Sequence, residues 1–169
     1  MSTISLRPLI PADVEILAHL ANNKKIWDGV RDHFPFPYTL DDARDFIDRK
    51  AEEVPAYTFA IINQEEKLCG VISLVPQEDV YRRTAEIGYW IGEPFWGQGL
   101  ATQAISLMTR YGFDELQLEW IFAAVFDFNL ASMRALEKNG YAKEGIFRKA
   151  VIKNGQVYDE HRYAKLKTD

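Results

Sequence analysis

The chain has 169 residues, of which 47% are hydrophobic and 27% charged, a composition that excludes a disordered, collagenous or coiled-coil chain. This length fits a single domain spanning residues 1–169, because separate hydrophobic cores usually appear only in longer chains. A formal net charge of −5 argues against nonspecific binding to nucleic acid or to an anionic membrane, whereas it permits a cationic partner such as an amine.

Several absences bear on where the protein works. The apolar run at residues 121–126 is far shorter than the roughly 20 residues of a membrane span, and residues 1–8 lack the pattern of a signal peptide. The lone Cys69 cannot form an internal disulfide, and its apolar strand predicts a buried packing residue. His19 and His161 are isolated, so no metal site is expected. We therefore expect a cytoplasmic protein without a metal.

The first part of the chain predicts one strand and two helices. Residues 4–7 alternate as a strand, and Pro11 suits the first turn of a helix. The apolar face of that helix is Val14, Leu17, Ala18 and Ala21. After an aromatic loop at residues 27–37, Thr39 is an expected N-cap in a capping-box relation with Asp42. Ala43, Phe46, Ile47 and Lys50 extend the second helix.

The middle of the chain alternates apolar and polar residues, which favours strands. Residues 57–62 and 68–75 are expected to pair around a polar turn, and residues 84–92 form the next strand. In that strand Glu86 and Trp90 share one face.

The last part of the chain predicts two helices and three strands. A helix opened by Gly97-Gln98-Gly99 carries Leu100, Ala104, Leu107, Met108 and Tyr111 on its apolar face. Residues 119–126 form a strand covered on both faces, and residues 129–138 form a helix that stops at Asn139-Gly140. Two final strands flank Asn154-Gly155, a strong hairpin signal. The whole order predicts an α+β or α/β three-layer domain with a mixed sheet.

Residues 90–102 are the segment best suited to chemistry, because a strand ends there, a glycine turn follows and a helix begins. Glycines allow close approach of a ligand, and the first N–H groups of a helix favour an anion such as a pyrophosphate. A plain strand–helix turn is the alternative. A dinucleotide fold is excluded because Thr102 occupies the third glycine position, and no run has the glycine and lysine spacing of a nucleoside-triphosphate loop.

Four motifs resemble the GNAT N-acyltransferase superfamily in the correct order. Residues 95–104, Phe-Trp-Gly-Gln-Gly-Leu-Ala-Thr-Gln-Ala, resemble its acyl-CoA pyrophosphate loop, and residues 129–141 resemble its later CoA-contacting helix. Residues 37–43 and 85–90 resemble the branch of ribosomal-protein N-terminal acetyltransferases and their small-amine relatives. Pro94 departs from the usual loop, which often begins with Gln or Arg, so phosphate contacts are expected to start at later amides.

This resemblance implies a GNAT fold with three α/β/α layers, a mixed and mostly antiparallel sheet of about seven strands, and about four helices. It also implies acetyl-CoA as co-substrate and a primary amine, on a protein N-terminus or a small molecule, as acceptor. The implied CoA-binding residues are Ile91, Gly92, Gly97, Gln98, Gly99, Leu100, Ala101, Thr102 and Asn129. A backbone N–H near Ile91 is expected to stabilise the oxyanion.

The resemblance also gives expected catalytic and acceptor residues. Glu86 is the expected general base and Ser132 the donor to the departing thiolate, with a surface ion pair and an ordinary helix serine as alternatives. Asn129 is either a pantetheine ligand or an N-cap. Trp27, His33 and Phe34 are expected to line the acceptor pocket, or else the loop covers the core. Asp159 could line the acceptor site or brace a turn.

Two alternatives to a protein acetyltransferase remain open. The first is acetyl transfer to a small amine or antibiotic on the same fold, and the second is a non-catalytic acyl-CoA sensor or partner-binding module. A monomer or a homodimer is expected, without nucleic-acid or membrane partners.

Overall fold

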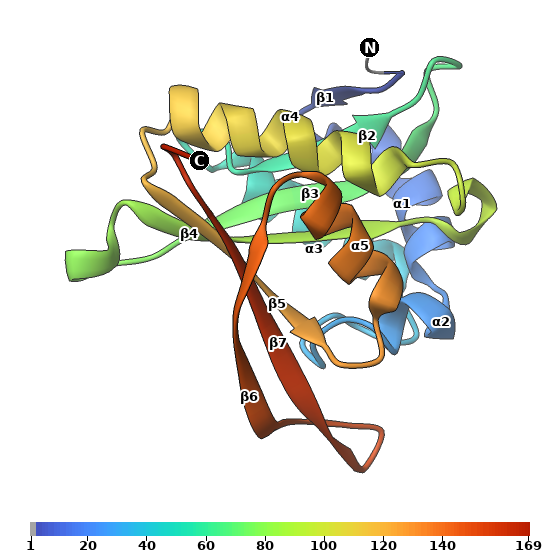
Figure 1. Ribbon diagram of the computed structural model, residues 1–169. Helices are drawn as coiled ribbons and strands as arrows, with labels where there is room; N and C mark the ends of the chain where they lie inside the picture. The colour runs from blue at the N-terminus through green and yellow to red at the C-terminus, as the bar shows by residue number, and fades with distance from the viewer. Residues whose placement is uncertain (1–2) are drawn as a thin grey trace. The chain divides into compact units, whose positions relative to one another are not determined.

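The computed structural model describes residues 3–169, in which five α-helices and seven strands are present (Figure 1). Residues 1 and 2, which belong to the stretch tested above for a signal peptide, lie outside this range. The strands are β1 (Ser5–Arg7), β2 (Thr58–Ile62), β3 (Leu68–Pro76), β4 (Thr84–Ile91), β5 (Trp120–Phe126), β6 (Ala142–Lys153) and β7 (Gln156–Leu166). The helices are α1 (Val14–Ala21), α2 (Lys24–Trp27), α3 (Leu40–Ala51), α4 (Leu100–Asp114) and α5 (Leu130–Lys138).

One mixed, mostly antiparallel sheet has the strand order β1-β2-β3-β4-β5-β7-β6. This confirms the expected mixed, mostly antiparallel sheet of about seven strands. The chain divides into two compact units, one from the N-terminus to Ser73 with Tyr89–Ala104, and one of Leu74–Gly88 with Ile105–Asp169. The prediction of a single domain stays a prediction.

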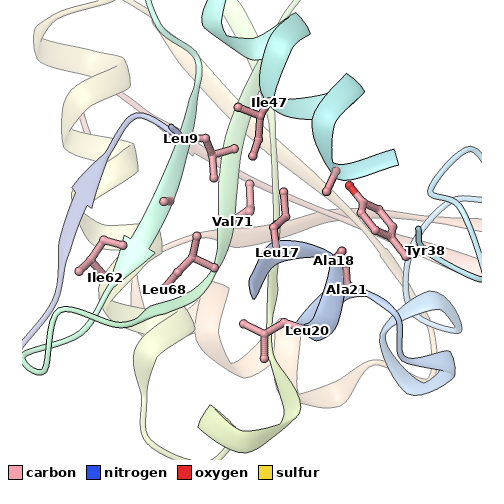
Figure 2. Packing of buried hydrophobic residues seen from close by; sticks show 12 residues of the cluster. Leu9, Leu17, Ala18, Leu20, Ala21, Tyr38, Ile47, Ile62, Leu68 and Val71 are labelled. Carbon is pink, nitrogen blue, oxygen red and sulfur yellow. The ribbon is translucent and has the colours of Figure 1, made fainter. Parts of the chain in front are cut away.

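The first unit packs α1 and α3 on β2 and β3. Its buried side chains point toward one another from these elements in Figure 2, and Leu17 and Ile47 are almost fully buried there. The predicted capping box is confirmed, because the Asp42 N–H donates to Thr39 Oγ1 (3.1 Å) and the Thr39 N–H to Asp42 Oδ2 (2.8 Å). These bonds satisfy N-terminal helix donors and fix where α3 begins.

The second unit consists of paired strands with α5 and most of α4. β4 and β5 pair in parallel from Thr84–Trp120 to Glu86–Phe122, and β7 pairs antiparallel with both β5 and β6. Figure 1 shows β6 and β7 as a long hairpin. At its turn Asn154 and Gly155 have φ of 52° and 74°, which confirms the hairpin predicted from the Asn-Gly pair.

Several sequence predictions for the helices need correction. The four-residue helix α2 was not predicted, so residue 27 ends a helix rather than beginning a loop. Pro11 starts a 3-10 turn rather than the α-helix, which begins at Val14. The start of helix α4, by contrast, agrees with the prediction: it begins at Leu100, directly after the glycine turn in which Gly97 and Gly99 adopt left-handed φ.

The predicted apolar face of α4 is shifted. Ile105 and Met108 are fully buried, whereas the predicted Leu107 and Tyr111 are half-buried. The buried stripe therefore runs nearer to Ala104, Ile105 and Met108 than the sequence spacing indicated.

Three further predictions can be compared with the structure, one about the burial of Cys69 and two about features not expected, a metal site and a membrane span. Cys69 is fully buried, as predicted, and burial raises the pKa of its thiol. Within residues 3–169 no group of three or more His, Cys, Asp or Glu side chains could hold a metal ion. In the same range no helix has the length and apolar character needed to cross a membrane.

Candidate active site

The glycine turn at residues 97–99 presents an open backbone directly before α4. Gly97 and Gly99 have φ of 76° and 72°, a region that L side chains rarely adopt. A Cβ at either position would meet nothing within 4 Å. The backbone conformation, and not packing, therefore requires glycine, and the turn has room beside it for a ligand.

The N-terminus of α4 supplies the electrostatic part of this site. The Gln103 N–H donates to the Gly99 carbonyl (3.2 Å), so the N–H groups of Leu100 and Ala101 precede the first hydrogen bond of the helix. Such N–H groups and the helix dipole favour an anion. The turn and the helix end together favour an anionic ligand such as a pyrophosphate.

The end of β4 is tied to this turn by an indole. Trp96 Nε1 donates to the Ile91 carbonyl (2.7 Å). The Gly92 N–H donates to the Cys69 carbonyl (2.7 Å), and the Gly92 carbonyl accepts from the Phe95 N–H (2.9 Å). Each backbone group of Gly92 therefore has a partner within the chain, and its carbonyl oxygen still has a second lone pair for a further hydrogen bond.

Gly70 on β3 allows the backbone of β4 to approach. A Cβ at Gly70 would overlap the Trp90 carbonyl oxygen and lie 3.0 Å from Ile91 Cα. The position of the last residues of β4 thus depends on the missing side chain at residue 70.

Glu93, in the turn that follows β4, is linked to helix α2. Its Oε1 accepts from Asn23 Nδ2 (2.9 Å) and its Oε2 pairs with Lys25 Nζ (2.6 Å). The Lys25 ammonium and then the Asn23 amide hold the pKa of Glu93 below its ordinary value. Nothing in the sequence pattern indicated this link.

The predicted acceptor residues occupy different environments in the first unit. Phe34 is partly buried against the core, with ring centroids 5.2 Å from Tyr38 and 6.0 Å from Trp90. Trp27 is half-buried beside Phe36 (6.0 Å), whereas His33 is exposed. The segment therefore covers part of the core at Phe34 and also presents groups to solvent.

Asn129 and Ser132 come together in the second unit. Asn129 Oδ1 accepts from the Ser132 N–H (3.3 Å) and caps α5. The N-cap interpretation is confirmed. It leaves the prediction of a CoA contact open, because capping engages the side-chain oxygen and the amide nitrogen is a separate donor.

Glu86, the expected general base, is placed by its strand pairing. It lies opposite Phe122 in the parallel register of β4 and β5, so the two side chains share one face of the sheet. Arg162 stacks on Phe122 (5.1 Å) and on Phe147 (4.6 Å) and donates to Glu160 (2.7 Å). Glu86 therefore belongs to a face that combines aromatic and charged side chains.

Asp159 braces a bulge of β6. Its Oδ1 accepts from the Lys149 N–H (2.8 Å), where Lys149 has φ of 56° and the β6–β7 register shifts. Asp127 Oδ2 in turn accepts from the Asp159 N–H (3.1 Å). Of the two roles left open by the sequence, the bracing role is the one these contacts support.

The mixed seven-stranded sheet and the glycine turn before α4 are the arrangement expected above for an acyl-CoA-dependent transferase. The acetyltransferase (GNAT) domain family matches residues 3–142. The chain belongs to this family, and it is an N-acetyltransferase that uses acetyl-CoA as co-substrate.

Similar proteins carry several acceptor descriptions. The probable N-acetyltransferase YjcK of Bacillus subtilis is 39% identical to this chain, in an alignment that covers 74% of this chain and 71% of YjcK. The putative ribosomal N-acetyltransferase YdaF of the same species is 32% identical over 98% of this chain and 92% of its own. Spermidine N(1)-acetyltransferase of Escherichia coli is 30% identical over 91% and 81%. Acetyl transfer to an amine is thus common to these relatives.

Solved structures agree with the fold. A GNAT-family acetyltransferase from Bacillus anthracis superposes with a TM-score of 0.86 at 25% identity, covering 99% of this chain and 97% of that one. The ribosomal alpha-N-protein acetyltransferase RimL in complex with coenzyme A gives 0.85 at 26% identity, covering 100% and 97%.

Proposed function

We propose that the protein acetylates a primary amine by direct attack while acetyl-CoA and the amine are bound together. The neutral amine nitrogen forms a bond to the thioester carbonyl carbon, and the carbon–sulfur bond breaks. The amine loses one proton to a base, and the departing thiolate takes up a proton. No acyl-enzyme is formed, so no nucleophilic side chain is required.

The observation that carries this proposal is the glycine turn before α4. Its left-handed Gly97 and Gly99, its open surroundings and the helix N-terminus suit a pyrophosphate better than a purely structural turn. We assign CoA binding to the backbone of residues 97–102, with Ile91 and Gly92 at the strand end and Asn129 at the start of α5.

The proton transfers are assigned to two side chains of the second unit. Glu86, directly or through water, accepts the proton that the incoming ammonium loses to become the neutral amine. After the attack the nitrogen loses a second proton to water, and the Ser132 hydroxyl donates a proton to the departing thiolate and regains one from water. A thiol of pKa about 8.5 leaves readily, so a strong acid is unnecessary at this step. The Glu86→Gln variant should lower kcat by about 10²-fold or more while the affinity for acetyl-CoA is kept.

The acceptor is proposed to be an amine, and residues 27–37 with Trp27, His33 and Phe34 are proposed to face it. Named relatives include both a putative ribosomal N-acetyltransferase and a spermidine N(1)-acetyltransferase. A peptide with a free N-terminus and spermidine are therefore the first two acceptors to compare, by measuring CoA release.

A thermal unfolding experiment tests the donor site. Acetyl-CoA at about 100 times its dissociation constant stabilises a protein by about 2.7 kcal/mol, which should raise the midpoint by several degrees. NAD and ATP are the control ligands and should leave the midpoint in place. A midpoint that does not move with saturating acetyl-CoA would contradict the assignment.

Two glycine variants locate the site. Gly99→Ala should weaken acetyl-CoA binding, since alanine is strained at this φ and its methyl group occupies the open side of the turn. Gly155→Ala is the matched control, because Gly155 also has a left-handed φ of 74° and nothing within 4 Å of its Cβ position. Equal affinities in the two variants would place the pyrophosphate elsewhere.

A further inference from the structure

Glu93 connects the turn that follows β4 to the N-cap of α2. One carboxylate oxygen accepts from Asn23 Nδ2 (2.9 Å) and the other from Lys25 Nζ (2.6 Å). Asn23 itself caps α2, because its Oδ1 accepts from the Lys25 N–H (2.9 Å). A shift of Glu93 therefore acts on both the second residue, Lys25, and the N-cap, Asn23, of this helix.

Helix α2 leads into residues 27–37 without a break in hydrogen bonding. The Asp28 N–H donates to the Lys24 carbonyl (2.8 Å), and the Val30 N–H donates to the Trp27 carbonyl (3.2 Å). The Trp27 ring also lies under Lys24 Nζ (5.7 Å). The position of α2 thus sets the start of the proposed acceptor segment.

A second contact joins the same two regions. Phe34, from the acceptor segment, meets Trp90 edge-on with ring centroids 6.0 Å apart. Trp90 directly precedes Ile91, whose carbonyl is held by Trp96. The region of residues 24–37 and the region of residues 90–96 are therefore joined at two places, the Glu93 contacts and the Phe34–Trp90 pair.

The Glu93 contacts are too exposed to contribute much to the free energy of unfolding. The side chains of Glu93 and Lys25 are 39% and 67% exposed, and exposed ion pairs contribute little to the free energy of unfolding. What the contacts do fix is geometry, since one carboxylate holds two groups of one short helix.

We propose that Glu93 is a positioning residue that couples acetyl-CoA binding to the order of residues 24–37. The proposal rests on the proposed function, since it takes residues 97–102 as the acetyl-CoA turn. Acetyl-CoA on this turn fixes residues 92–99, Glu93 then holds α2 in place, and the acceptor segment becomes ordered. Coupling of this kind is reciprocal, so a bound amine also strengthens acetyl-CoA binding.

Amide hydrogen exchange with and without acetyl-CoA measures this coupling. In the wild-type protein, saturating acetyl-CoA should slow exchange in peptides covering residues 97–102 and, several-fold, in those covering residues 24–37. Glu93→Ala should abolish most of the second effect and keep the first. Glu93→Gln, which can still accept from Asn23 but cannot pair with Lys25, should fall between them.

Glu65→Gln is the matched control, because Glu65 forms another exposed ion pair of the same unit, with Lys67 (2.7 Å). It should leave the exchange of residues 24–37 unchanged.

If Glu93→Ala speeds the amide exchange of residues 24–37 equally with and without acetyl-CoA, Glu93 is only a structural brace and the proposed coupling is wrong. Protection at residues 97–102 without protection at residues 24–37 in the wild type also overturns it. A wild type that shows neither protection nor a thermal shift instead overturns the proposed donor site.

Discussion

An indole N–H links the end of β4 to the residue directly before the glycine turn. Trp96 is 45% exposed, so its ring contributes little to the core, whereas its N–H makes a 2.7 Å hydrogen bond to the Ile91 carbonyl. We predict that Trp96→Phe, which keeps an aromatic ring and removes the donor, weakens acetyl-CoA binding about 2- to 12-fold. This range corresponds to a net hydrogen-bond contribution of about 0.5–1.5 kcal/mol, and calorimetric titration would measure it.

The control for this variant is a half-buried indole that also donates a hydrogen bond. Trp120 Nε1 donates to Glu144 Oε1 (3.1 Å) on β6. Trp120→Phe should lose a comparable hydrogen bond and keep the affinity for acetyl-CoA. A similar loss of affinity in both variants would show that the Trp96 contact has no particular role.

Gly70 has a residue-scale role of a different kind, because it acts through the space it leaves. Gly70→Ala forces a methyl group onto the Trp90 carbonyl, which is backbone and cannot rotate away. We predict a loss of about 1–3 kcal/mol in the free energy of unfolding, the usual range for overpacking, together with weaker acetyl-CoA binding. Urea unfolding would measure the first effect, and Gly145→Ala, where the nearest atom is Phe147 Cε1 at 3.6 Å, is the tolerant control.

At the scale of elements, the N-cap of α5 allows a structural role to be separated from a proposed contact with CoA. Asn129 caps the helix through its side-chain oxygen. Asn129→Ser keeps an oxygen for the cap and removes the amide donor, so the urea midpoint should change little. We predict that KM for acetyl-CoA rises several-fold if the amide binds pantetheine, whereas an unchanged KM would assign Asn129 to capping alone.

The elements predictable from sequence are those with local signals. The Thr39–Asp42 capping box, the Asn139-Gly140 helix stop and the Asn154-Gly155 hairpin depend on neighbouring residues, and the structure contains all three. Helix α2 has no such signal. Its four residues are too few to show a helical period. Its N-cap, Asn23, is held by Glu93, which lies 70 residues further along the chain.

The candidate site follows the same division. The glycine turn could be predicted because left-handed φ and a helix N-terminus require particular residues in sequence. The roles of Trp96 and Gly70 could not, since the first depends on a side chain reaching back to β4 and the second on the approach of another strand. Tertiary contacts of this kind leave no periodic pattern in the sequence.

At the scale of the whole molecule, a buried carboxylate makes the stability of the fold depend on pH. Asp13 is only 5% exposed. Burial alone would raise the pKa of its carboxyl, but hydrogen bonds from Arg7 and the Ile10 N–H outweigh burial and hold the pKa below its ordinary value. A carboxyl with a lowered pKa in the folded state stabilises that state most when it is ionised.

The sign of the pH dependence follows from this shift. The stabilisation is complete above the unfolded pKa of about 3.9 and is lost as the pH falls through the lower folded value. Asp13→Asn should cost about 1.5–3 kcal/mol at pH 7, the range for hydrogen bonds to a charged group. The difference from wild type should shrink as the pH drops below about 4, because protonation removes the same interaction from the wild type. Urea unfolding from pH 7 to pH 3 measures this convergence.

Asp41→Asn, at an exposed ion pair with Arg44, is the control and should follow the wild-type curve throughout. A gap between wild type and Asp13→Asn that stays constant with pH would show that the ionised carboxylate is not what stabilises the fold.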